Sequence, residues 1–209
     1  MKPQVKNLLL GLAIGFSLFG VGLFILNRKK STKKINSILF IGDSNTFANF
    51  SYADQLKKIF PNLLIKKIAK NGANTQWMSE QLRDELKKYK HDVVAILGGS
   101  NDIYGSGKID GAKKNLDEMY SFAHTVGSKV IAITPPNKDF YENKTDAKQN
   151  LLSELVDWIM SNKKADYKID FHKITNDKSF FSKADGYLHP QSNAHKLLAD
   201  ETKEQLNLA

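Results

Sequence analysis

A serine, a histidine and an aspartate in this chain have the types and the spacing that ester hydrolysis requires. Ser44 lies in the run FIGDSNT, at a tight turn between an apolar run and a helical pattern. Asp185 and His189 lie four residues apart near the other end of the chain. An imidazole oriented by a carboxylate can take the proton of a serine hydroxyl and later return it to a leaving group. If the fold brings them together, these residues indicate a nucleophilic hydrolase.

Hydrolysis of an ester also requires donors for the oxygen that becomes negative in the transition state. Gly72 offers a backbone amide, Asn101 offers a side-chain amide, and the backbone amide of Ser44 would be a third donor. Removal of one such donor typically lowers kcat by roughly 10²–10³. Four separate segments of the chain thus carry groups for one reaction.

The hydrophobic pattern alternates between two periods from residue 36 onward. Short apolar runs rich in β-branched residues predict buried strands, and an alternating run at 167–171 predicts an edge strand. The buried strands are expected at residues 38–41, 63–68, 93–97 and 130–133. Apolar residues at helical spacing predict helices at residues 52–60, 78–89, 112–126 and 151–159 and from residue 194. Strand followed by helix five times predicts an α/β fold, a three-layer α/β/α domain with a five-stranded parallel sheet.

In a sheet of this kind, ligand chemistry gathers in the loops beyond the carboxyl ends of the strands. Ser44 lies in the first of these loops, Gly72 in the second and Asn101 in the third. Asp185 and His189 lie beyond the fifth strand, just before the last helix. The predicted fold therefore places all five residues at one edge of the sheet.

In their order along the chain, these segments resemble the motif blocks of the GDSL-type esterases, the SGNH hydrolase superfamily, over nearly all of residues 36–205. The matching blocks are Gly42-Asp43-Ser44, Gly72, Gly99-x-Asn101-Asp102 and the Asp185/His189 pair. The resemblance implies a flavodoxin-like fold in which Ser44 is the nucleophile, His189 is the general base and Asp185 orients the base. It also implies an oxyanion hole formed by Ser44, Gly72 and Asn101.

The chain departs from the family pattern at two positions. The family usually spaces the last aspartate and histidine as DxxH, whereas one more residue separates Asp185 from His189. A bulge at Gly186 would absorb the extra residue. Asn45 follows the nucleophile where relatives often have leucine, which changes a wall of the pocket rather than the reaction.

Each motif also has a purely structural interpretation. Ser44 could cap a helix, Asp43 could close an Asx turn, Gly72 could serve a turn and Asp185 could cap one. Independent caps and turns do not predict this ordered set, which favours the hydrolase. Because the spacing of Asp185 and His189 is irregular, a catalytically silent module that binds a carbohydrate or an acylated partner is the alternative. A lysophospholipase or a thioesterase is a further interpretation of the same fold.

Composition and charge exclude several other classes of function. Zero cysteines exclude disulfides, thiolate metal sites and cysteine nucleophiles. The remaining histidines have no partner at ligand spacing, so we predict no metal and no cofactor, and we expect His195 to be a surface or packing residue. Of the 31 basic residues, seven lie in residues 1–34, where there is no acid. The remaining 24 basic residues are balanced by 22 acidic ones, which argues against nucleic-acid binding.

Residues 8–26 form an uncharged run, LLLGLAIGFSLFGVGLFIL. At a rise of about 1.5 Å per residue, a helix of this length spans roughly 28 Å, close to the hydrocarbon core of a bilayer. A cleaved signal peptide is the rival interpretation, but the run is long for one and no A-x-A-like site follows it. We predict a short basic N-terminus at 1–7, a single-pass transmembrane helix at 8–26, a basic connector at 27–35 and a hydrolase-like domain at 36–209.

The charge pattern leaves the side of the membrane open. Two lysines precede the span and five basic residues follow it, which favours a cytoplasmic domain by the positive-inside rule. An uncleaved signal anchor that exports the domain begins in the same way, and the work of anchored relatives on envelope material favours the extracytoplasmic side. Because Ser44 lies at the far end of the first strand from the anchor, a small-molecule or envelope-saccharide ester is the expected substrate.

Two glycines of the span raise the question of self-association. Gly11 and Gly15 form a GxxxG step, which lets two membrane helices approach closely. The step permits weak self-association of the anchor, unless it reflects only the abundance of glycine in membrane helices.

Overall fold

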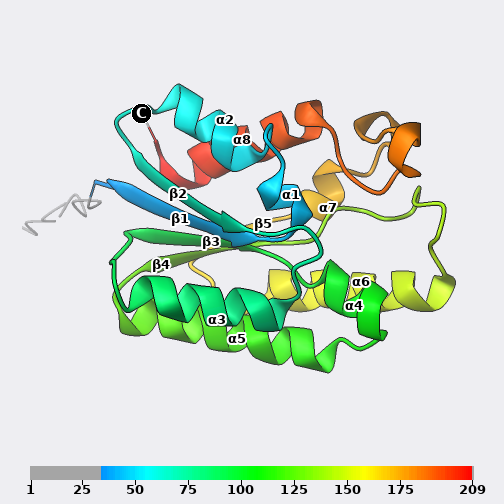
Figure 1. Cartoon of the computed structure of the whole chain (residues 1–209), viewed down its shortest axis with the longest axis horizontal. Coiled ribbons are helices and arrows are strands. Elements are labelled where there is room, and N and C mark those ends of the chain that lie inside the picture. The colour runs from blue at the N-terminus through cyan, green and yellow to red at the C-terminus, as the bar shows by residue number, and fades with distance from the viewer. Residues whose placement is uncertain (1–33, 209) are drawn as a thin grey trace, which may run out of the picture. The chain divides into compact units, whose positions relative to one another are not determined.

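A parallel five-stranded sheet forms the middle layer of the protein (Figure 1). The computed structural model describes residues 34–208. Across the sheet the strands follow the order β2 (Leu64–Ala69), β1 (Ser37–Gly42), β3 (Val93–Leu97), β4 (Lys129–Ile133) and β5 (Tyr167–Ile169). Gly42, the last residue of β1, pairs with Ala69 on β2 and with Leu97 on β3. The carboxyl ends of these three strands are therefore level, and the loops that follow them start at one edge.

Helices cover both faces of the sheet (Figure 1). One face carries α3 (Thr75–Leu86), α4 (Ser100–Ser106), α5 (Asp110–Thr125) and α6 (Asp146–Ser161). The other face carries α1 (Ser44–Phe47), α2 (Tyr52–Ile59), α7 (Phe171–Ile174) and α8 (Ser192–Leu206). Two short 3-10 turns, η1 (Lys178–Phe180) and η2 (Lys183–Asp185), lie between α7 and α8.

The two hydrophobic cores follow from the period of two along each strand. On β1, Leu39 and Ile41 belong to the core under α3, α5 and α6, whereas Ile38 and Phe40 belong to the core under α2 and α8. All four side chains are fully buried. Because successive side chains of a strand point to opposite faces, a run of apolar residues supplies both cores at once. The predicted three-layer α/β/α fold with a five-stranded parallel sheet is confirmed.

Two details of the strand prediction were wrong. Residues 63–68 were expected to form a buried strand, but β2 lies at the edge of the sheet, where Lys66 and Lys67 are only partly covered. Each lysine forms a salt bridge of 2.6 Å on its own face of the sheet. Lys66 pairs with Glu85 on α3, and Lys67 pairs with Asp54 on α2. The fifth strand ends at Ile169 rather than at residue 171.

The early end of β5 has a local cause. The side chain of Asp170 accepts a hydrogen bond from the backbone N–H of Lys173, which makes it the N-cap of the short helix α7. Phe171 thus begins a helix and is buried in the core under α8 instead of continuing the strand.

The predicted transmembrane helix at 8–26, with Gly11 and Gly15, lies outside the described residues, as does most of the connector at 27–35. Within residues 34–208, none of the helices combines the length and the apolar character that a membrane crossing requires. The described residues, 34–208, belong to one compact unit.

Gly42 provides a test of the close packing beneath Ser44. A Cβ atom at this position would lie 2.1 Å from the Thr46 hydroxyl oxygen and 2.8 Å from the Leu97 carbonyl oxygen. We expect Gly42→Ala to lower the free energy of unfolding by about 1–3 kcal/mol in urea titrations, because the backbone cannot yield without moving β1. The control is Gly105→Ala inside α4, where a Cβ meets nothing within 4 Å. The control should be neutral or stabilising by up to about 1 kcal/mol, and equal effects at the two sites would contradict the packing argument.

Candidate active site

Ser44 is held at the end of β1 by the turn into α1. Asp43 is the N-cap of α1, and its side chain accepts a hydrogen bond from the backbone N–H of Asn45 at 2.9 Å. The backbone N–H groups of Thr46 and Phe47 both donate to the carbonyl of Asp43. These bonds fix the backbone on either side of the serine. The Ser44 side chain therefore leaves the backbone at a defined position at the edge of the sheet.

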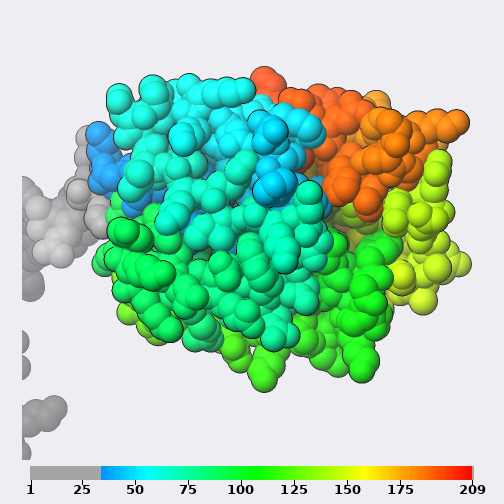
Figure 2. Space-filling view, in the orientation of Figure 1, coloured from blue at the N-terminus to red at the C-terminus, as the bar shows by residue number. Residues whose placement is uncertain are grey.

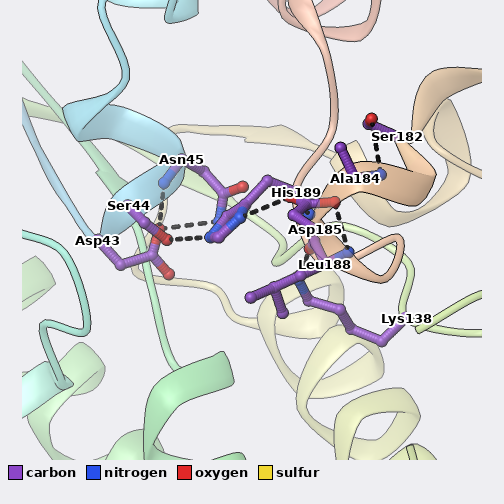
Figure 3. Close-up of polar contacts among 9 residues, drawn as sticks. All are labelled: Asp43, Ser44, Asn45, Lys138, Ser182, Ala184, Asp185, Leu188 and His189. Carbon is purple, nitrogen blue, oxygen red and sulfur yellow. Dashed lines mark hydrogen bonds and ion pairs between the residues drawn. The ribbon is translucent and has the colours of Figure 1, made fainter. Parts of the chain in front are cut away.

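His189 joins Ser44 to Asp185 (Figure 3). The His189 Nε2 atom lies 3.0 Å from the Ser44 hydroxyl oxygen, and its Nδ1 atom lies 3.0 Å from Asp185 Oδ2. These distances suit an imidazole that donates from Nδ1 to the carboxylate and accepts the serine proton at Nε2. The structure thus brings together three residues that the sequence analysis selected from opposite ends of the chain.

The extra residue between Asp185 and His189 is accommodated by two left-handed residues in succession. Gly186 has φ 65° and Tyr187 has φ 60°. Both carboxylate oxygens of Asp185 then accept backbone N–H bonds, from Leu188 at 3.3 Å and from His189 at 3.1 Å. Asp185 therefore closes its own turn and orients the imidazole. The expected adjustment at Gly186 is present, but nothing in the sequence indicates that Tyr187 shares it.

The segment that carries His189 lies beside α1 on the molecular surface. In Figure 2 the orange surface of the segment from η1 to the start of α8 adjoins the blue surface of α1, although the two are far apart in the sequence. An isolated bridge between Phe181 and Pro190 ties the two ends of this segment together. The position of His189 is thus fixed by the segment as a whole.

The predicted oxyanion donors lie in the loops that follow β2 and β3. Asn101 donates from Nδ2 to the carbonyl of Ala73 at 2.9 Å, which orients its amide and leaves the second N–H of that group free to face a ligand. Gly72 has φ +69°, and a Cβ built there would meet nothing within 4 Å. Ser44, Gly72 and Asn101 all line one hollow of about 420 Å³. The structure therefore groups the three predicted donors with His189.

Asp102 ties these donors to the fold. Its carboxylate accepts bonds from the backbone N–H of Thr75 at 3.0 Å and from the Thr75 hydroxyl at 2.7 Å. Burial raises the pKa of Asp102 above its ordinary range, against the effect of these bonds. The starts of α3 and α4 are thereby locked to each other, and Asn101 is positioned from α4.

A second hollow, of about 340 Å³, flanks the serine on the side of α1. It shares Ser44, Asn45, Asn71 and His189 with the first hollow. Phe47 and Phe50 line its far wall and are nearly half exposed. The reacting pair thus lies between two hollows, which is room for the two parts of an ester.

Two charged side chains lie beneath the site, and the sequence analysis assigned neither of them a role in the reaction. Asp43 is fully buried and accepts bonds from Asn45 and from the Ser100 hydroxyl. Burial raises its pKa, while these bonds and the charge of Lys138 lower it. Lys138 is also buried, and its ammonium donates to the carbonyl of Leu188. Nothing in the sequence marks Lys138, because its burial depends on loops that are distant along the chain.

His195 lies below the second hollow and is a packing residue, as predicted. It is 1% exposed and contacts the rings of Phe50, Tyr52 and Phe171. Burial, together with a smaller effect of the His189 charge, lowers its pKa to about 4. Within residues 34–208, no cluster of three or more histidine, aspartate or glutamate side chains could hold a metal ion.

Comparison with known proteins identifies the family. Residues 40–197 match the GDSL-like lipase/acylhydrolase family. The chain belongs to that family. As a member of this family of lipases and acylhydrolases it is a hydrolase of ester bonds.

Solved structures of the family share the fold. A member of the lipolytic G-D-S-L family from Veillonella parvula superposes with a TM-score of 0.70 at 17% identity, over 83% of this chain and 99% of that chain. An acetylxylan esterase from Geobacillus stearothermophilus gives a TM-score of 0.66 at 17% identity, over 83% of this chain and 95% of that chain. At these identities the likeness concerns the fold.

One curated protein of another description is similar in part. The metal ABC transporter substrate-binding lipoprotein FimA of Streptococcus parasanguinis is 28% identical over 136 residues, which is 60% of this chain and 41% of that protein. The chain thus spans less than half the length of this relative.

The buried imidazole of His195 gives a pH-dependent stability. Its pKa is about 4 in the folded protein and about 6.5 when unfolded. As the pH falls below 6.5, the unfolded chain binds a proton that the folded protein excludes, so stability is lost between about pH 6.5 and about pH 4. We expect His195→Phe, which keeps an aromatic ring in the cluster, to gain about 2 kcal/mol relative to the wild type on going from pH 7 to about pH 4.5. Urea unfolding followed by circular dichroism measures the difference in unfolding free energy between His195→Phe and the wild type. A difference that does not change with pH would contradict the lowered pKa of His195.

Proposed function

We propose that this chain is a membrane-anchored serine esterase that releases a small acyl group, such as acetyl, from a saccharide or another water-soluble ester. The observation that carries the proposal is the continuous hydrogen-bonded path from Ser44 through His189 to Asp185, with 3.0 Å at each of its two imidazole contacts. Ser44, His189 and Asp185 are assigned the roles of nucleophile, general base and orienting carboxylate. No cofactor takes part in this mechanism.

The reaction proceeds in two halves. The Ser44 oxygen attacks the ester carbonyl carbon while His189 Nε2 accepts the hydroxyl proton. The carbonyl oxygen becomes negative and is stabilised by the N–H groups of Ser44, Gly72 and Asn101. His189 then gives the proton to the departing alkoxide, which leaves as the alcohol. In the second half, water attacks the acyl-serine while His189 Nε2 accepts a proton from it. The bond to the Ser44 oxygen then breaks, His189 returns the proton to that oxygen, and the carboxylic acid is released.

Two features support a polar alcohol portion. Asn71, Tyr104 and Tyr141 line the hollow that holds the oxyanion donors. Asn71 and Tyr141 offer an amide and a hydroxyl to a hydroxylated ligand, and the Tyr104 hydroxyl, which donates to Gln149, offers an acceptor. A structural neighbour with the same fold is an acetylxylan esterase. The half-exposed Phe47 and Phe50 of the second hollow are the feature that would favour a longer acyl chain, as in a lysophospholipase.

The chain-length dependence of ester cleavage tests the proposal. We expect the purified full chain to cleave p-nitrophenyl acetate faster than p-nitrophenyl octanoate. Ser44→Ala should lower kcat by more than about 10³, because no other group replaces the nucleophile. Asn101→Ala should lower kcat by roughly 10²–10³ with a smaller change in KM, because the donor acts in the transition state.

Ser161→Ala is the matched control, because Ser161 is an exposed serine whose hydroxyl bonds only to the Trp158 carbonyl. It should keep wild-type kinetics. Activity that survives Ser44→Ala would contradict the assigned nucleophile. Ligand binding without turnover of any ester by the folded chain would favour the catalytically silent binding module, and a preference for lysophospholipid would favour the lysophospholipase.

The proposed anchor at residues 8–26 and an extracytoplasmic domain make a second prediction. The run has the length of a bilayer core and no charge. We expect the full chain to stay in the membrane fraction after alkaline carbonate extraction, and a chain lacking residues 1–33 to be released. Protease added to intact spheroplasts should digest the domain, whereas protection until lysis would place it in the cytoplasm.

A further inference from the structure

Lys138 is an unusual residue to find beside a reacting serine. It follows β4, and 4% of its surface is exposed. Figure 3 shows its side chain extending toward the segment that carries His189, where the ammonium donates to the carbonyl of Leu188. Leu188 is the residue directly before His189, so the contact is made at the backbone that carries the imidazole.

The contact meets a requirement that the Asp185–His189 turn creates. Inside the turn, Asp185 accepts the N–H groups of Leu188 and His189. Two carbonyls of the turn accept hydrogen bonds from outside it. The backbone N–H of Glu142 donates to the Gly186 carbonyl at 3.1 Å, and Lys138 supplies the donor for Leu188. The loop after β4 therefore supports the turn from outside.

The charge of Lys138 is retained despite its burial. The hydrogen bond of its ammonium goes to a backbone carbonyl, that of Leu188, and not to a carboxylate. Burial lowers its pKa to about 8, while the charges of Asp43 and Asp185 act in the opposite direction. A buried cation without a direct partner is destabilising compared with an apolar side chain of similar volume. Its presence next to the reacting groups is therefore better explained by function than by stability.

We propose that Lys138 is a positioning residue for the general base: its ammonium holds the Leu188 carbonyl and thereby fixes the His189 imidazole between Ser44 and Asp185. This inference rests on the proposed function of Ser44, His189 and Asp185. It assigns to the loop after β4 a part in catalysis that requires no contact with the substrate.

Lys138→Met tests the role, because it removes the charge and the donor but keeps the length of the side chain. With the full chain and p-nitrophenyl acetate, we expect kcat to fall on the order of 10–100-fold while KM changes by less than about threefold, because a misplaced base slows the chemical step. The melting temperature should stay level or rise. Lys144→Met is the control on the same loop, since the exposed Lys144 bonds to the Asp139 carbonyl and not to the turn.

The pH profile separates positioning from mere packing. Wild-type kcat should fall above about pH 8 as the ammonium loses its proton, and Lys138→Met should lack this fall. Lys138→Arg, which keeps a donor and a permanent charge, should retain most of the activity at pH 7 and also lack the fall. The ionisable groups around Lys138 are Asp43 from the β1–α1 turn, Asp185 and His189 from the turn it supports, and Tyr104 and Tyr141 from the same hollow.

The kinetics of the variants show whether Lys138 positions the general base, contacts the substrate or has no part in catalysis. A folded Lys138→Met chain with wild-type kcat overturns the inference, and so does a change confined to KM, which would make Lys138 a substrate contact. If Lys138→Met does not fold, the comparison of Lys138→Arg with the wild type decides: an alkaline fall in both overturns the inference, and a fall in the wild type alone supports it. Ser44→Ala measured in parallel identifies the other failure, because activity in that variant would refute the proposed function itself.

Discussion

The hydrogen bond between Ser44 and His189 joins residues that are 145 positions apart, and most of the fold serves to make that bond possible. Ser44 follows a central strand, whereas His189 precedes the last helix. The two meet because parallel strands place all their carboxyl ends at one edge of the sheet and because α8 packs against α2 beside that edge. Shifting the register of β1 by one residue would exchange its two apolar faces and move Ser44 away from the turn that carries His189.

The two cores and the site obey different physical rules. The cores are almost wholly apolar and close-packed on each side of the sheet, and they supply the favourable free energy of folding. Beneath the site the chain buries Asp43 and Lys138, and it holds Tyr187 in the left-handed region, which is costly for a residue with a side chain. Such departures from the rules of stable packing gather where function requires a fixed geometry.

The sequence predicted what depends on short-range pattern and on residue chemistry. The short apolar runs of β1, β3 and β4, rich in β-branched residues, are enough to locate those strands. Ser44, His189 and Asp185 stand out because few side-chain types can do their chemistry. The same pattern failed for β2, since an apolar run does not reveal which strand lies at the edge; Lys66 and Lys67 were the signal, because buried central strands rarely contain lysine. The short helix α4 was missed because its seven residues include Gly105, are flanked by a glycine at each end and show little apolar periodicity.

Lys138 was beyond the reach of sequence reasoning for a different reason. A lysine after a strand usually extends into solvent, and only the approach of the turn at residues 185–189 buries this one. With one more residue than the family pattern, Asp185 still reaches the imidazole. The Gly186 and Leu188 carbonyls of this longer turn take their donors from the loop after β4. What the chemistry fixes is the position of three side-chain atoms, not the number of residues between them. A longer turn can therefore replace a shorter one when a second loop supplies the donors, which couples the loop after β4 to the segment that carries His189.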